Sequence, residues 1–213
     1  KGFHKLGLIT LSGIFTAVLS LYLIGLASSL FVLVLHCSFA IGFFVITKRQ
    51  KVSLLITGNI LLCLFCISFL WLRSLEEFGR DLMIWLVLAV WFTDIGGFLF
   101  GKIFGGKKLV PSISPNKTWS GLFGAILLCG IWGQIWLFYF NVYGSEIIIA
   151  GFFLAVLAQL GDLSISFLKR RNGVKDSSKL IPGHGGVLDR LDGFLLTGPV
   201  TMIIFLATHK GVI

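Results

Sequence analysis

Long apolar stretches restrict the fold of this chain more than any other feature of its sequence. Runs of about twenty mostly apolar residues recur between short polar segments, and a helix of that length crosses a hydrocarbon core of roughly 30 Å. Only 13% of the 213 residues are charged, whereas roughly a quarter are charged in soluble domains. Because lipid offers the backbone no hydrogen-bond partners, these runs predict membrane-spanning helices.

The apolar runs predict an all-α fold, namely a polytopic transmembrane helical bundle of about seven spans. We expect one integral membrane domain over residues 1–213. The expected spans are residues 6–26, 28–47, 53–72, 82–100, 119–140, 147–168 and 193–209. Only a short link, Ala27-Ser28-Ser29, separates the first two spans.

The basic residues predict the orientation of these spans. If the N-terminus lies inside, all but three of the 18 Lys and Arg residues fall on the cytoplasmic side, the exceptions being Arg73, Arg80 and Lys210. Short cytoplasmic loops are enriched in Lys and Arg. The charged stretch 162–192 is therefore expected at the cytoplasmic interface, where it can meet anionic headgroups and nucleotides.

Residues 162–192 concentrate charge in an otherwise apolar chain. The charged or titratable residues of this stretch are Asp162, Lys169, Arg170, Arg171, Lys175, Asp176, Lys179, His184, Asp189, Arg190 and Asp192. Gly185 and Gly186 let the backbone approach a bulky anion, because glycine has no Cβ and tolerates positive φ. The cations can neutralise phosphates, and the carboxylates can hold a hard divalent cation such as Mg²⁺.

Ionisable residues inside membrane spans are costly and mark functional sites by default. Asp94 lies toward the inner end of its span and Asp162 toward the inner end of another, so their carboxylates are expected at a similar depth. Asp162, Ser166 and Lys169 share one helical face. We expect two to four carboxylates to converge, with structural salt bridges to Lys169 or Arg190 as the alternative for Asp162 and Asp189.

A second polar stretch precedes the fifth span. Pro111 and Pro115 stiffen this segment, and Lys117 with Thr118 at a helix start offers a cation, a hydroxyl and free N–H groups to a phosphate. The alternative for Thr118 is a simple helix N-cap. Because this stretch and residues 162–192 lie on the same predicted face, the two are expected to form opposite walls of one cleft.

Two further features are expected to serve helix packing. The Gly97-x-x-x-Gly101-x-x-x-Gly105 spacing is more typical of a helix-packing surface than of a phosphate loop. Gln159 is a single amide within a span, and such amides usually form interhelical hydrogen bonds.

The motifs of both polar stretches resemble the signature of the phosphatidate cytidylyltransferases, also called CDP-diacylglycerol synthases. The matching motifs are Ser166-x-Leu168-Lys169-Arg170, Lys175-Asp176-x-Ser178, Pro182-x-His184-Gly185-Gly186-x-x-Asp189-Arg190-x-Asp192 and Ser114-Pro115-x-Lys117-Thr118-Trp119-x-Gly121. An ordered match over so many positions is far more specific than a lone glycine-rich loop. The resemblance implies a membrane nucleotidyltransferase that transfers CMP from CTP to phosphatidic acid, giving CDP-diacylglycerol and pyrophosphate for phospholipid synthesis.

The resemblance also assigns roles to residues. Those implied as catalytic are Asp162, Asp189, Asp192, Lys169, Arg170, Lys175, Asp176, His184 and Arg190. Those implied to bind the nucleotide are Ser114, Asn116, Lys117, Thr118, Lys179, Gly185 and Gly186. The implied cofactor is Mg²⁺, held by Asp162, Asp189, Asp192 and Asp94, and a second cation is left open.

The implied setting is a bacterial-type inner membrane with the active site facing the cytoplasm. The expected partners are CTP, phosphatidic acid and the lipid bilayer; a homodimer is left open and no nucleic acid is expected. One alternative is a CTP-dependent polyprenol or phytol kinase, and an alternative from another class is a transporter of an anionic substrate. Since the sequence begins with Lys1, we expect part of the natural N-terminus to be missing.

Overall fold

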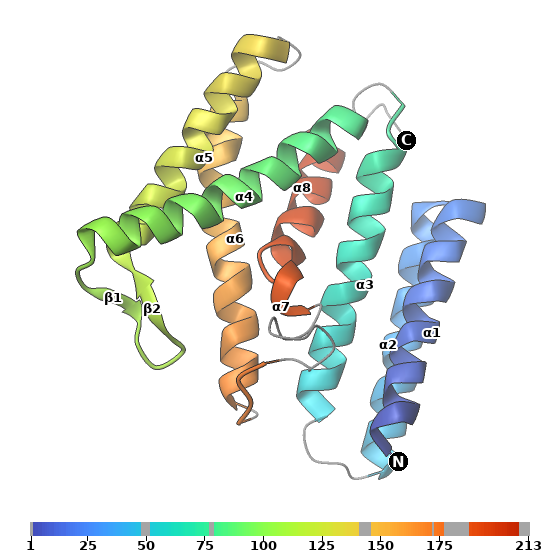
Figure 1. Ribbon diagram of the computed structural model, residues 1–213. Coiled ribbons are helices and arrows are strands. Elements are labelled where there is room, and N and C mark those ends of the chain that lie inside the picture. Colours follow the sequence, from blue (N-terminus) through green and yellow to red (C-terminus); the bar gives the residue numbers. More distant parts are fainter. Residues whose placement is uncertain are drawn as a thin grey trace. The chain divides into compact units, whose positions relative to one another are not determined.

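The computed structural model describes residues 2–47, 52–76, 79–140, 146–171, 173–176 and 188–208, and most of these residues are helical (Figure 1). The elements are α1 (Gly2–Leu23), α2 (Leu26–Thr47), α3 (Val52–Ser74), α4 (Gly79–Phe104), β1 (Lys108–Val110), β2 (Ser114–Thr118), α5 (Trp119–Phe140), α6 (Glu146–Arg171), α7 (Leu188–Leu191) and α8 (Phe194–Thr208). The chain forms two compact units, one comprising Lys1–Arg80 with Gly198–Ile213 and the other Asp81–Thr197.

Each predicted span coincides with a helix, namely α1 to α6 and α8. Within the described ranges, three helices are long and apolar enough to cross a membrane: Gly79–Phe104, Trp119–Tyr139 and Ile147–Arg171. The largely helical membrane fold is thus confirmed. The count of seven spans and the single membrane domain stay predictions.

The break between the first two helices lies at Ile24 and Gly25, so its expected position at Ala27-Ser28-Ser29 was wrong. The N–H groups of Ile24 and Gly25 both donate to the carbonyl of Ser20, at 3.0 and 3.2 Å. Gly25 has a φ of 116°, a conformation that glycine adopts without steric cost. The serines lie inside α2 because their hydroxyls bond to backbone carbonyls; Ser29 Oγ, for example, donates to a carbonyl of α1 at 2.8 Å.

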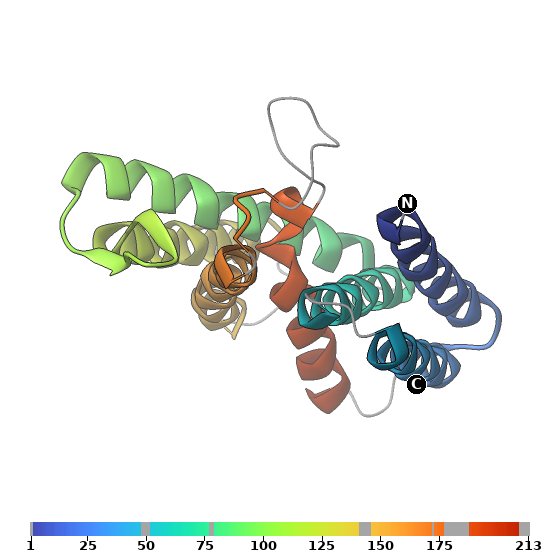
Figure 2. The ribbon, with the colours of Figure 1, turned by 90° about the horizontal axis from the view of Figure 1, so that it is seen from below.

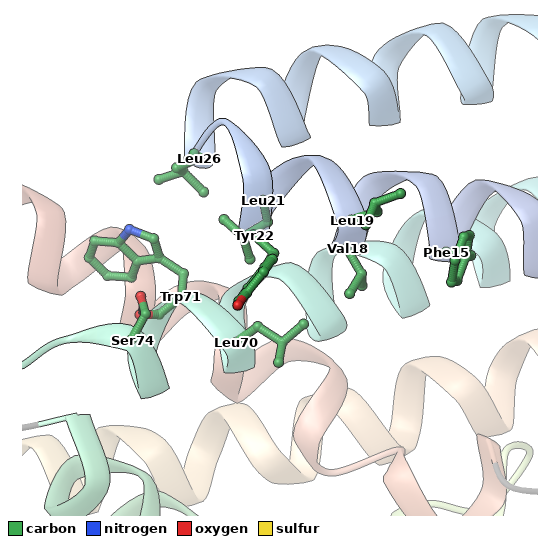
Figure 3. A pocket seen from close by; sticks show the side chains of 10 residues that line it. Phe15, Val18, Leu19, Leu21, Tyr22, Leu26, Leu70, Trp71 and Ser74 are labelled. Atoms are coloured by element: carbon green, nitrogen blue, oxygen red, sulfur yellow. Dashed lines mark hydrogen bonds between the residues drawn. The ribbon is translucent and has the colours of Figure 1, made fainter.

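In the first unit, α1, α2 and α3 pack against one another, as the view from below shows (Figure 2). Their side chains line an open, apolar pocket of about 550 Å³. Tyr22 from α1 and Leu70 from α3 point toward one another across it (Figure 3). None of the described residues that line this pocket is charged, so it offers no groups that could neutralise a phosphate.

In the second unit, α5 and α6 lie side by side (Figures 1 and 2), and glycines bring α4 close to α5. A Cβ added to Gly96 would lie 2.5 Å from the carbonyl oxygen of Gly124, and one added to Gly121 would lie 2.7 Å from that of Gly97. Such distances are shorter than any real Cβ contact, so only glycine permits this approach of the two backbones. The helix-packing interpretation is confirmed for Gly97.

We therefore expect Gly96→Ala to lower the melting temperature of the detergent-solubilised protein, because overpacking typically costs about 1–3 kcal/mol. Gly58→Ala is the matched control: a Cβ there meets nothing within 4 Å, and alanine favours helix over glycine. Thermal unfolding followed by circular dichroism compares the two variants. Equal melting temperatures would contradict the close helix approach.

A short hairpin joins α4 to α5, so the all-α expectation was incomplete. Strand β1 pairs antiparallel with β2, with Lys108 opposite Thr118. The connecting turn begins at Pro111, whose fixed φ suits a turn position, and the N–H of Ile113 donates to the carbonyl of Val110 at 3.2 Å. The hairpin carries Lys117, one of the candidate site residues.

Candidate active site

Lys117 on β2 joins the hairpin to α6. Its ammonium Nζ lies 2.5 Å from Oδ2 of Asp162 and donates to Oε1 of Gln159 at 2.8 Å. The side chains of Lys117 and Asp162 are 18% and 33% exposed, so this ion pair is partly shielded from water. The two motif-bearing stretches, which were expected to face one cleft, thus meet at this ion pair.

One face of α6 supplies the acceptors. Gln159, Asp162 and Ser166 follow at spacings of three and four residues, which places them on one side of a helix. The hydroxyl of Ser166 donates to Oδ1 of Asp162 at 3.2 Å, which confirms the predicted shared face. Gln159 was expected only to bond between helices, yet it contacts a candidate site residue. Gln159 precedes Asp162 by three residues, and this helical spacing was the feature of the sequence that could have indicated its place beside the site.

A second ion pair lies further along the same helix. Nζ of Lys169 is 2.7 Å from Oδ1 of Asp189 on α7, and their side chains are only 13% and 9% exposed. The structural salt bridge considered as the alternative for Asp189 is therefore present. Asp189 is engaged by an ammonium group in this structure.

Asp192 lies between α7 and α8, outside the apolar helices, and its carboxyl group is a neighbour of Asp162. Its Oδ1 accepts the N–H of Gly193 at 2.9 Å. Burial, and next the negative charge of Asp162, raise the pKa of the Asp192 carboxyl to about 7. The turn approaches α6 closely, since a Cβ on Gly161 would lie 2.5 Å from the carbonyl oxygen of Asp192.

Asp94 on α4 is a further carboxylate near the ion pair of Lys117 and Asp162. It lies within electrostatic range of both Asp162 and Lys117, so the structure brings together the two span carboxylates expected at one depth. Asp94, Asp162 and Asp192 are oxygen donors of the kind that Mg²⁺ prefers. Among the described residues, however, no three such side chains lie close enough together to form a complete metal site. The carboxylate oxygens of these residues are suitable donors for a divalent cation. Asp162 is the carboxylate that interacts with both of the others.

Thr118 takes the capping role that was its alternative interpretation. The N–H of Gly121 donates to Thr118 Oγ1 at 3.1 Å, which is the bond of an N-cap to the third residue of its helix. The Thr118 side chain is buried, and its hydroxyl also pairs with Ser120 at 3.0 Å. Ser114 is half-buried on β2 and Asn116 is exposed. Their predicted contacts with a nucleotide stay predictions.

The remaining candidates lie nearer solvent or outside the described part of the chain. Those exposed in the last turn of α6, after this helix or on α7 are Arg170, Lys175, Asp176 and Arg190. Those outside the described residues are Lys179, His184, Gly185 and Gly186. Where α6 ends, Gly173 has a φ of 68°, and the guanidinium of Arg170 donates to the carbonyl of Val174 at 3.4 Å.

Fold and site together define a class: a largely helical membrane protein in which ammonium groups pair with carboxylates. A sequence model of the Cytidylyltransferase family matches residues 1–208. The chain therefore belongs to the cytidylyltransferase family.

Curated relatives agree with this family. A phosphatidate cytidylyltransferase of Rickettsia felis is 42% identical over 146 residues, covering 65% of this chain and 64% of that protein. One of Staphylococcus haemolyticus is 38% identical over 142 residues, covering 66% and 55%. One of Rickettsia bellii is 46% identical over 132 residues, covering 56% and 57%. The chain thus spans less than two thirds of the length of these relatives.

Proposed function

We propose that the protein transfers CMP from CTP to phosphatidic acid, giving CDP-diacylglycerol and pyrophosphate. The observation that most directly supports this proposal is the contact of Lys117 with Asp162, which joins the two motif-bearing stretches of the chain. The family match and the names of the relatives support this activity. The site faces the cytoplasm of a bacterial-type inner membrane, and the protein crosses that membrane about seven times.

The reaction brings two anions together. An oxygen of the phosphatidate phosphate attacks the α-phosphorus of CTP; a new O–P bond forms, the bond to the bridging oxygen of the β-phosphate breaks, and pyrophosphate leaves. A phosphate monoester is already ionised near neutral pH, so no general base is needed. The demand on the protein is positioning and charge neutralisation.

Ammonium and guanidinium groups neutralise the phosphates. Lys117 and Lys169, which pair with carboxylates in the described part of the chain, would contact the phosphates, and Arg170, Lys175 and Arg190 add charge at the exposed rim. Lys179 and His184 complete this set, and Gly185 with Gly186 lets the backbone approach the nucleotide.

Carboxylates would hold the cation. Asp162 and Asp192 would be its main ligands, and Asp94 and Asp189 are further candidates. When bound, Mg²⁺ supplies further positive charge for the α-phosphate and for the pyrophosphate that leaves. A second cation and a homodimer are compatible with this arrangement.

Doubly labelled CTP tests the activity in membranes that contain the protein. With tritium in the cytosine ring and radioactive phosphorus in the γ-phosphate, we expect tritium in the lipid fraction and the phosphorus label in free pyrophosphate. Phosphorus label in lipid without tritium would indicate a lipid kinase. Neither label in lipid would leave transport of an anion as the better hypothesis.

The predicted topology has a separate test. In a variant whose four native cysteines are replaced, a cysteine at Ser178 should react with impermeant thiol reagents only from the cytoplasmic side. One at Ser145 should react only from the opposite side, because the basic loops lie inside. Labelling of intact cells and of inverted vesicles distinguishes the two faces, and the reverse pattern would overturn the placement of the site.

A further inference from the structure

Two acceptors of α6 hold the ammonium group of Lys117 at once. One is the carboxylate of Asp162, at 2.5 Å, and the other is the amide oxygen of Gln159, at 2.8 Å. Gln159 is only 9% exposed, so its amide is largely shielded from water that would compete for the bond. The ammonium group of Lys117 is therefore held by two specific acceptors on α6, unlike a lysine in a chance surface contact.

The ammonium group of Lys117 lies where it would compete with a metal ion for Asp162. Its Nζ already contacts Oδ2 of that carboxylate, which such a cation would need as a ligand. Two positive groups repel at such a distance, so the ammonium group and a divalent cation compete for this carboxylate. The other oxygen, Oδ1, accepts the hydroxyl of Ser166 at 3.2 Å.

We propose that Lys117 is the counter-ion of Asp162 in the substrate-free protein, and that a divalent cation displaces it when the site is loaded. Gln159 is the positioning residue of this exchange, because it keeps hold of the ammonium group after Asp162 has released it. The displaced ammonium then lies beside the incoming phosphates. This inference rests on the proposed function, in which Asp162 holds a cation.

The exchange explains why a carboxylate and an amide act together. A buried ammonium left without any partner is strongly unfavourable, so release from Asp162 alone would be costly. Gln159 offers a neutral acceptor that does not itself attract a divalent cation as a carboxylate does. A Cβ on Gly97 would lie only 3.4 Å from Nε2 of Gln159, so α4 packs closely against this amide.

Binding of Mn²⁺ alone tests the exchange. Electron paramagnetic resonance measures the concentration of free Mn²⁺ as the ion is titrated into purified, nucleotide-free protein in detergent. Lys117→Met should bind Mn²⁺ about tenfold more tightly than the wild type or better, because the competing charge-assisted bond is gone. Lys117→Arg keeps a positive charge and should remain within a few-fold of the wild type. Lys102→Met is the matched control, since Lys102 is an exposed lysine of α4 whose Nζ lies 5.6 Å from the Phe98 ring centroid.

Gln159→Leu provides the second variant. This variant removes the amide acceptor of Gln159, so the ammonium group of Lys117 is held less firmly beside Asp162. Mn²⁺ binding should therefore tighten, but by a smaller factor than in Lys117→Met. The KM for CTP should rise by a larger factor than kcat falls. A variant damaged only in its folding would instead bind Mn²⁺ more weakly.

The outcomes separate this inference from the proposed function. Unchanged or weaker Mn²⁺ binding by Lys117→Met, in a protein whose wild type transfers CMP, would overturn the counter-ion role alone. Wild-type membranes that form no cytidine lipid would overturn the proposed function itself.

Discussion

Asp162→Asn is expected to lower CMP transfer by about a thousandfold, the scale on which loss of one preorganised electrostatic group acts. The carboxylate interacts with several described residues: it pairs with Lys117, accepts the hydroxyl of Ser166 and adjoins Asp192. Asparagine keeps the size but removes the charge. Lys117 then has no anionic partner at this position and the cation loses its central ligand.

Asp81→Asn is the control for this variant. Asp81 lies in the first turn of α4, well before Asp94 along the same helix, so an equal change of charge there should alter turnover by no more than a few-fold. Turnover is measured at saturating Mg²⁺, and circular dichroism with size-exclusion chromatography verifies that both variants fold. Near-normal activity of Asp162→Asn would show that the Asp162 carboxylate is not needed for the reaction.

Local sequence patterns predicted the helices and one face of the site. Apolar runs of helical length predicted α1 to α6 and α8, and the spacing of Asp162 and Ser166 predicted their shared face. Both predictions depend only on residues within one helix. The position of the first break failed for a local reason: Ser28 and Ser29 look like a polar link, yet serine hydroxyls can bond to helix carbonyls, whereas Gly25 can take a positive φ.

The contacts between distant residues were not predictable in this way. Strand β2 contains Pro115, and proline usually argues against a strand; a two-stranded hairpin tolerates it because each strand has an unpaired edge. The bond from Lys117 to Gln159 spans 42 residues, and no periodicity within either segment encodes it. The ordered motifs indicated that both stretches belong to one site, but not which atoms meet.

The ion pair of Lys169 and Asp189 allows stability and function to be separated. Each single replacement, Lys169→Met or Asp189→Leu, leaves one charge in a place where the side chains are only 13% and 9% exposed. Breaking a buried pair in this way costs roughly 3–5 kcal/mol. We therefore expect both single variants to melt at markedly lower temperature and to have little activity.

The double variant Lys169→Met/Asp189→Leu gives the decisive comparison. Apolar residues of similar volume often replace a buried ion pair without loss of stability, so its melting temperature should return close to that of the wild type. Its CMP transfer should stay at least about ten- to a hundredfold down, because a charge-assisted contact with phosphate is worth roughly 1.5–3 kcal/mol. Melting temperature and turnover are measured on the same preparations. If stability and turnover both recovered, the pair would be structural, and Lys169 and Asp189 would have no part in the chemistry.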